Sequence, residues 1–341
     1  MEKSIIPPVE RALLKAELTK NKLLRKTNKA NNEIYIFTAH TSPNLMLEVG
    51  RLRELSFRDS GGGTGNEIDT DEFDYMKKPY TQLIVWDPQA EEILGGYRFI
   101  HGSDVEFDEN GQPRLSTAHM YHFTEKFNKE YMPYTLELGR SFVQPDYQSS
   151  KMGTKSLFAL DNLWDGLGAL SIVVPDSKYY FGKFTMYPTF NREARNMILY
   201  YIQKYFPDHD NLVYPIEPME LNIDYPRMET LFSSGDMFLD YKFLNKSVRS
   251  YKCNIPPLVN AYVNLSPTMK NFGCAVNHEF AEVEETCILV TIADIFEEKR
   301  KRYIETFLQS VPKNVIRLMR NRWIKRKFRR KPKNTGRPQI L

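Results

Sequence analysis

The chain has 341 residues, of which 41% are hydrophobic and 13% aromatic. This composition provides a sizeable core and excludes global disorder. No run of about 18 apolar residues occurs, so we expect no segment that crosses a membrane, and the first residues lack the apolar stretch of a signal peptide. The three cysteines are far apart and odd in number, which favours a reducing cytoplasm.

The net charge of +4 conceals a division between the body of the chain and its C-terminal end. From Arg317 onward there are 11 Lys or Arg and no acid, whereas the rest carries 36 basic and 43 acidic residues. Trp323 and Phe328 lie among these basic residues. A helix of this kind would lie on anionic lipid, and a disordered solubilising tail is the alternative. No RNA-binding motif supports a nucleic-acid partner.

Apolar periodicity predicts the elements of the N-terminal half. Leucines among lysines predict a helical arm over residues 9–29, and helical spacing recurs over residues 43–58. A flexible glycine-rich loop is expected over residues 60–65. Alternating and β-branched residues predict strands over residues 33–37, 82–86, 93–100 and 135–143.

In the C-terminal half the same patterns predict further elements, followed by a weaker region. Helices are expected at about 150–167, 191–205 and 256–262, strands at 179–182 and 287–292, and irregular polar chain over 215–254. The last strand is a candidate to close the sheet. This order predicts a mixed α/β sheet with helices on both faces.

Two charged residues interrupt the otherwise apolar strand over residues 135–143. Glu137 and Arg140 are three positions apart, and burying charges in a strand is costly unless they are paired or used. The strand leads into a polar turn and then a helix, which makes its end a candidate site. Burial would raise the pKa of Glu137 and suit it to act as a general base. An ion pair with Arg140 or another basic residue is the structural alternative.

Several short motifs occur in an order that resembles one superfamily. The chain resembles the GNAT acyltransferases that make N-acylated amino-acid lipids, most closely the ornithine-lipid and glycine-lipid N-acyltransferases that are often labelled "hemolysin-like". It is more distantly similar to the acyl-homoserine-lactone synthases. The resemblance spans about residues 33–295. The motifs are RELSFR at 53–58, DEFD at 71–74, GGYR at 95–98, ELGRSFVQPDYQ at 137–148, LWDGL at 163–167 and YFG at 180–182.

The resemblance implies a GNAT fold with a C-terminal extension. We expect three parts: an N-terminal helical arm over 1–32, an acyltransferase domain over 33–296 with an insertion at about 207–254, and a basic helix or tail over 297–341.

The resemblance also places the acyl donor beside the strand of Glu137, with its phosphate on the loop before the next helix. The implied donor-binding residues are Val143, Gln148, Lys151, Gly153 and Thr154. Lys151 replaces the first glycine that this loop usually carries, which disfavours the pyrophosphate of CoA. The single phosphate of acyl carrier protein suits Lys151 better, so we expect acyl carrier protein as the donor and no permanently bound cofactor. An exposed lysine at a helix start is the alternative.

The acceptor is implied to bind near Arg53, Phe57, Asp71, Asp74 and Arg98. Asp71 and Asp74 would share one face and hold the amine, although helix-start carboxylates are common. Phe57 has an alternative role in the core. Arg98, on an apolar strand, is expected to pair with one of these aspartates.

Arg140 is implied to bind a carboxylate or to hold the strand end. His119 and His122 have the spacing of metal ligands, but no third ligand is evident nearby, so no metal site is expected. Neither a Gly-x-Ser-x-Gly motif nor a Cys-His arrangement stands out, so we expect no acyl-enzyme.

We therefore expect a cytoplasmic enzyme at the inner face of the membrane. It would transfer a (3-hydroxy)fatty acyl group from acyl carrier protein to the α-amine of an amino acid, with glycine favoured and ornithine as the second choice. A homoserine-lactone synthase is one alternative, and the long segment after Phe206 argues against it. A non-catalytic membrane-binding or lytic protein is the other, and no export signal supports it.

Overall fold

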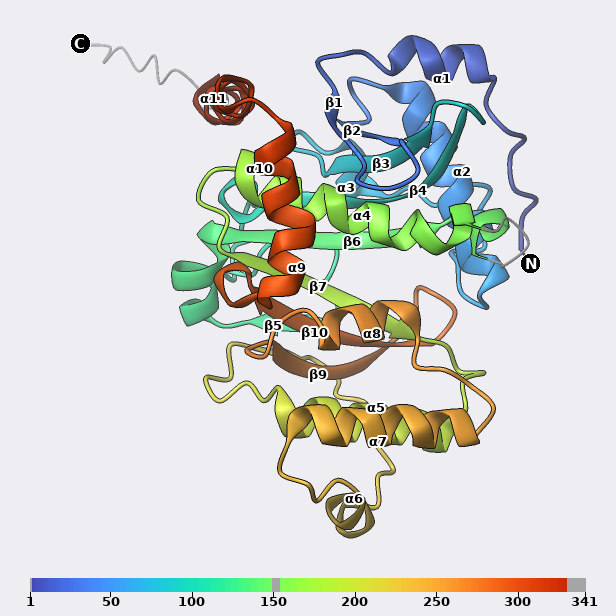
Figure 1. The fold of residues 1–341 in the computed structure, drawn as a ribbon, viewed down its shortest axis with the longest axis vertical. Helices are drawn as coiled ribbons and strands as arrows, with labels where there is room; N and C mark the ends of the chain where they lie inside the picture. Colours follow the sequence, from blue (N-terminus) through green and yellow to red (C-terminus); the bar gives the residue numbers. More distant parts are fainter. Residues whose placement is uncertain (1, 149–153, 330–341) are drawn as a thin grey trace, which may run out of the picture.

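The computed structural model describes residues 2–148 and 154–329, with the side chains outside 154–157 and 325–329. Its centre is an eight-stranded sheet in the order β1-β2-β3-β4-β6-β7-β10-β9, which runs from top to bottom in Figure 1. A small second sheet joins β5 (Tyr121–Phe123) to β8 (Val213–Pro215). The strands of the large sheet are β1 (Leu23–Lys26), β2 (Glu33–Phe37), β3 (Thr81–Asp87), β4 (Glu92–His101), β6 (Thr135–Val143), β7 (Tyr179–Met186), β9 (Lys270–Asn277) and β10 (Val283–Thr291).

Helices cover both faces of the large sheet, as the sequence predicted. The helix α4 (Thr154–Val173) packs Leu163 and Leu170 against one face, in a core shared with Leu83 of β3 and Leu136 of β6. The helix α2 (Pro43–Asp59) packs on the other face, against β3 and β4. The other helices are α1 (Arg11–Glu17), α3 (Glu72–Tyr75), α5 (Arg192–Tyr205), α6 (Tyr225–Leu231), α7 (Met237–Ser250), α8 (Pro257–Val263), α9 (Glu297–Arg300), α10 (Thr306–Ser310) and α11 (Lys313–Arg329).

The feature that positions the site is a split between β6 and β7. These two neighbours pair in parallel only over residues 135–137 of β6 and 179–181 of β7. Beyond Glu137, β6 continues to Val143 paired with β4, and beyond Phe181, β7 continues to Met186 paired with β10. The two strands therefore diverge within one sheet. Past the split, their backbone groups on that side have no partner strand among the described residues.

Several predicted elements match the structure and others differ. The helix predicted over 43–58 and the first four strands are present within a residue or two. The arm predicted over 9–29 is wrong: only α1 is helical there, and β1 joins the sheet by pairing with β2. Leu24 of β1 is buried in the main core, so tertiary packing selects a strand over local helical spacing.

The C-terminal half is more regular than the sequence indicated. The region predicted as irregular contains α6 and α7, whose apolar faces pack on α5. The expected last strand is present as β10, but it does not close the sheet. The strand β9, which was not predicted, pairs with β10 and forms the edge. A glycine at position 273 with φ of 88° and a register shift interrupt its pattern.

The basic C-terminal segment forms α11 and packs on the body. Trp323 contacts Phe99 of β4, with ring centroids 6.0 Å apart, and Ile316 is buried in the main core. Trp323, which lies among the basic residues of the expected lipid-binding helix, thus covers the sheet with its ring. The side chain of Phe328 lies outside the described residues. In the part of the chain that the structure describes, none of the helices has the length and apolar character needed to cross a membrane.

Candidate active site

A cavity of about 620 Å³ occupies the split between β6 and β7. It passes from one face of the sheet to the other. On the side of α4 its walls are largely apolar, and on the side of α2 they are aromatic and charged. The first wall includes Tyr97, Leu163, Trp164, Leu167 and Tyr262, and the second includes Phe57, Lys183, Thr185, Tyr187, Phe280 and Glu285.

A bulge in β6 forms the wall of this cavity at its centre. Arg140 and Ser141 together lie opposite Tyr97 of β4, so β6 carries one extra residue there. Arg140 has a φ of 51°, in the left-handed region that residues with a Cβ seldom adopt. Such strain is found where the surrounding structure enforces it, often at functional sites. The bulge places residues 139–141 in the wall of the cavity.

Glu137 lies at the apex of the split, on the side of α2. Its side chain is buried, with 1% of the residue exposed. Among the described residues, no donor lies in hydrogen-bonding geometry to either carboxylate oxygen. Burial raises its pKa to about 7, against the opposing effects of the Arg98 charge and the Tyr80 hydroxyl. The alternative of an ion pair with Arg140 is wrong, because Arg140 binds Asp69 instead, with Nε 2.9 Å from Oδ2. A buried carboxylate with a pKa near 7 is suited to accept a proton.

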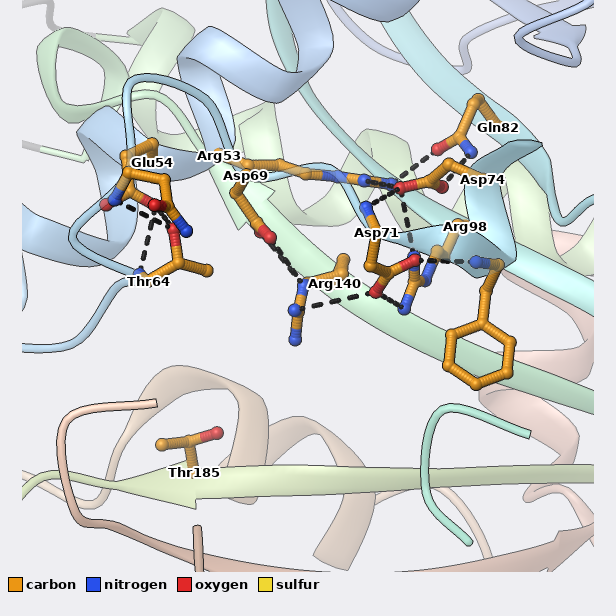
Figure 2. Close-up of polar contacts among 12 residues, drawn as sticks. Arg53, Glu54, Thr64, Asp69, Asp71, Asp74, Gln82, Arg98, Arg140 and Thr185 are labelled. Atoms are coloured by element: carbon orange, nitrogen blue, oxygen red, sulfur yellow. Dashed lines mark hydrogen bonds and ion pairs between the residues drawn. The ribbon is translucent and has the colours of Figure 1, made fainter. Parts of the chain in front are cut away.

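Behind Glu137 lies a neutral network of three arginines and three aspartates (Figure 2). Arg98 binds Asp71 through two contacts of 2.6 and 2.7 Å, and its Nη1 lies 3.0 Å from Asp74. Arg53 contacts Asp74 at 3.2 Å. Burial alone would raise the pKa of Asp74, but Arg98 and Arg53 outweigh it and lower that pKa to about 2. The predicted pairing of Arg98 with Asp71 or Asp74 is confirmed for both aspartates.

The aspartates of the network also stabilise the local backbone at the start of α3. Asp71 caps α3 by accepting a hydrogen bond from the backbone of Phe73, while Asp74 accepts one from the backbone of Asp71. Arg53, Asp74 and Arg98 are completely buried and do not line the cavity. In this structure they therefore support the site from behind.

The glycine-rich loop is held in place by one carboxylate. Glu54 of α2 accepts hydrogen bonds from the backbone of Thr64 and Gly65, at 3.0 and 2.8 Å, and from the Thr64 hydroxyl (Figure 2). Gly61, Gly63 and Gly65 have positive φ, so the turns need glycine. The predicted flexible loop is thus a tethered one, and it packs on the aromatic wall of the cavity.

The structure brings only some of the predicted site residues to the cavity. Phe57, Arg140, Val143 and Gln148 line it. The proposed phosphate contacts Lys151 and Gly153 lie outside the described residues. Thr154 opens α4, and its side chain is also outside the described part.

Sequence reasoning missed the residues that β7 and β10 contribute. Lys183 donates a hydrogen bond to Glu285, and the Thr185 hydroxyl lies 3.4 Å from the same carboxylate. Thr185 lies across the gap from the arginine network in Figure 2. A signal existed for one of them: Lys183 is the charged residue of the otherwise uncharged stretch 179–186, whereas Glu285 follows a second acid, Glu284, at the start of β10. No local pattern shows that these two stretches are neighbours in the sheet. Among the described residues, no group of three or more His, Cys, Asp or Glu has the arrangement of a metal site.

The fold and the cavity agree with comparisons to known proteins. A family model for the acetyltransferase (GNAT) domain matches residues 52–157, which contain the second half of α2, the bulged strand and the start of α4. The split sheet and its cavity therefore define an acyltransferase of the GNAT superfamily, the fold and enzyme class that the motif order predicted.

Two curated relatives specify the family. The glycine N(alpha)-acyltransferase of Bacteroides thetaiotaomicron is 58% identical over 308 residues, which cover 90% of this chain and 91% of the relative. That of Phocaeicola vulgatus is 56% identical over 308 residues, covering 90% and 94%. The chain belongs to the GNAT family of these glycine N(alpha)-acyltransferases. None of the solved structures matches it.

Proposed function

We propose that this protein transfers a (3-hydroxy)fatty acyl group from acyl carrier protein to the α-amine of glycine. The amine nitrogen bonds to the thioester carbonyl carbon, and the carbon–sulfur bond breaks. The glycine ammonium gives up two protons, one of which ends on the released thiol and one on a base. The product, an N-acylglycine, is an aminolipid precursor. The observation that carries the proposal is the pair of relatives named for glycine acylation, at 56–58% identity over 90% of the chain.

Glu137 is the proposed base. It lies at the apex of the split, and burial raises its pKa to about 7, so it is poised to take a proton near neutral pH. Its side chain does not line the cavity directly, which means that the proton passes through a water molecule. No covalent acyl-enzyme is needed, because the deprotonated amine attacks the thioester itself.

The split supplies the other requirements of acyl transfer. Past Glu137 the edge of β6 that faces β7 has no ladder partner in the part of the chain that the structure describes. Its backbone amides at the bulge are available to the thioester carbonyl as charge develops on oxygen. The apolar wall beside α4, with Leu163, Trp164 and Leu167, suits an acyl chain. Arg140 is already compensated by Asp69 and Asp71, so we assign it to holding the bulge.

The donor and the membrane contact are further parts of the proposal. Acyl carrier protein is favoured over CoA because Lys151 replaces a glycine in the phosphate-binding loop. The exposed basic residues of α11, including Arg317, Arg320 and Arg322, are suited to an anionic bilayer that receives the lipid product. In Figure 1, α11 lies at the opposite side of the molecule from the start of α4. We therefore assign its charge to the membrane and not to the donor.

The test is a reconstituted reaction. The full chain is mixed with 3-hydroxyacyl carrier protein or the matching acyl-CoA, and with glycine or ornithine, and products are measured by mass spectrometry. We expect N-acylglycine, formed faster from the carrier protein at low donor concentration. Acylornithine as the main product would contradict the assignment of glycine as the acceptor. Equal rates with both donors would contradict the preference for acyl carrier protein. Lipids from cells that express the chain provide a second measurement.

A further inference from the structure

The charged pair on β7 and β10 has no evident role in holding the fold. Lys183 and Glu285 form an ion pair in the wall of the cavity, with side chains that are 12% and 4% exposed. A buried ion pair seldom adds stability over apolar residues of similar size. This one lies at the split, because Lys183 is two residues beyond Phe181, the partner of Glu137. Its place at the reaction centre calls for a chemical explanation.

The position of the pair matches the substrate of the proposed function. An amino acid at neutral pH is a zwitterion, with an ammonium and a carboxylate on one carbon in the case of glycine. Lys183 and Glu285 present the complementary charges side by side. Thr185, which is directly opposite Glu285 in the ladder, adds a hydroxyl to the carboxylate. When a zwitterion binds between Lys183 and Glu285, its two charges form two ion pairs in place of the original one. The net charge of the cavity does not change.

The surroundings of the pair limit the size of that zwitterion. Phe57 and Phe280 pack edge to face, with centroids 5.1 Å apart. Tyr187 follows Thr185 on the same face of the chain, and both Tyr187 and Phe280 lie against Gly62, where a Cβ would come within 3.0 and 3.1 Å of the two rings. The tethered loop thus fixes an aromatic wall beside the charges. An amino-acid side chain on that side of the charges would meet these rings.

We propose that Lys183 and Glu285 form the acceptor subsite, in which Lys183 binds the amino-acid carboxylate, Glu285 binds the ammonium, and the aromatic wall of Phe57, Tyr187 and Phe280 excludes larger side chains. This inference rests on the proposed function and specifies which residues recognise the acceptor amino acid. The bound ammonium then lies beside the split, where Glu137 accepts its proton and the thioester is held by β6.

The first experiment needs no variant. The wild-type chain is given saturating acyl donor and either glycine or glycinamide, which retains the amine and lacks the carboxylate. We expect kcat/KM for glycine to be at least about tenfold higher, the range for losing a hydrogen bond to a charged group. Equal use of the two acceptors would overturn the subsite. A wild-type chain that acylates neither glycine nor glycinamide would contradict the proposed function instead.

Variants then test the role of each charged residue in binding the acceptor. In Lys183→Met the preference for glycine over glycinamide should disappear. In Glu285→Gln the KM for glycine should rise at least about tenfold, with the KM for the donor unchanged. The matched control is Glu284→Gln: Glu284 is the next residue on β10 and pairs with the buried Arg195 at 2.6 Å, but it does not line the cavity. Its glycine KM should stay native. A native glycine KM in Glu285→Gln would overturn the role of Glu285.

The role of the aromatic wall is tested by measuring the selectivity for glycine over alanine. Phe280→Ala should raise the ratio of kcat/KM for alanine to that for glycine by at least about tenfold, since one methyl group is worth roughly 10–200-fold in a fitted pocket. An unchanged ratio in a variant that still acylates glycine would show that these rings do not select the acceptor.

Discussion

Glu137 and Phe181 form the last pair of the parallel ladder between β6 and β7. One strand of this pair carries the buried carboxylate, and the other leads two residues later to Lys183. The sheet opens beyond them, and the bulge at Arg140 forms part of the wall of the opening. The base, the proposed oxyanion donors and the proposed acceptor subsite therefore come together because two neighbouring strands stop pairing at one position.

The first prediction concerns catalysis by Glu137. Replacing Glu137 by Gln should lower kcat at least about 100-fold, the lower range for the loss of a general base, because an amide cannot accept the proton. In the wild type, kcat/KM should fall as the pH drops below about 7, where Glu137 becomes protonated. Steady-state rates from pH 5.5 to 8.5 (~3 pH units around that pKa) measure both effects. A folded variant with near-native rates would remove Glu137 from the mechanism.

The substitution that lowers the activity should raise the stability of the folded protein at neutral pH. The pKa of Glu137 is 4.5 without perturbation and about 7 in the folded protein, because burial disfavours the charged form. Between these two values the folded state holds a proton that the unfolded state releases, so wild-type stability falls as the pH rises. Above pH 7 the loss is complete. Its size is on the order of 3 kcal/mol at most.

Glu137→Gln removes this titration. We therefore expect the variant to become more stable than the wild type as the pH rises from 5 towards 8 (~2.303RT per proton and pH unit), and to differ little below that window. Urea denaturation at several pH values measures the difference. A pH-independent difference between the two proteins would indicate that Glu137 does not titrate in this range.

A third prediction concerns the arginine network. Asp74→Asn should lower the free energy of unfolding by about 3–5 kcal/mol, because it leaves Arg53 and Arg98 buried with less compensating charge. Glu72→Gln is the control, since Glu72 lies on the same short helix in an exposed pair with Arg114 and should change stability little. Equal effects of the two substitutions would contradict a supporting role for Asp74.

A fourth prediction concerns α11. Removing the whole segment would also remove Ile316 and Trp323 from the core, so charge substitution is the cleaner test. Changing the exposed Arg317, Arg320 and Arg322 to Gln should weaken binding to anionic vesicles by roughly 1 kcal/mol per residue near the surface. Added salt should weaken the wild type in the same way. Acylation of water-soluble glycine should be unaffected. Unchanged sedimentation with anionic vesicles at low salt would place the membrane contact elsewhere.

The sequence indicated much of this fold because its central elements have strong local patterns. The strands around Glu137 are apolar and bounded by turns, and α2 and α5 have clear helical periodicity. The motif order was enough to identify the GNAT class and the family of the curated relatives. Glu137 stood out because a charge in an apolar strand is unusual, and its burial and lack of an ion pair with Arg140 agree with that signal.

Local patterns failed where long-range pairing selects the conformation. The segment of β1 has helical spacing, but the edge of β2 provides hydrogen bonds and a core for Leu24. The edge strand β9 has a positive-φ glycine within it and depends on β10 for its existence. In α11 the basic composition indicated a helix that lies on anionic lipid, and no local pattern showed that the ring of Trp323 would meet Phe99, more than 200 residues earlier.

By itself the sequence determined the class of enzyme, the strand that carries Glu137 and the partners available to Arg98, because each depends on residue type and local order. Only the tertiary structure decided that β6 and β7 separate beyond Glu137, that Arg140 turns to Asp69, and that Lys183 and Glu285 meet in the same cavity. The reason is physical. Contacts between strands about 100 residues apart are set by the packing of the whole sheet, and no local pattern encodes which strand becomes the neighbour.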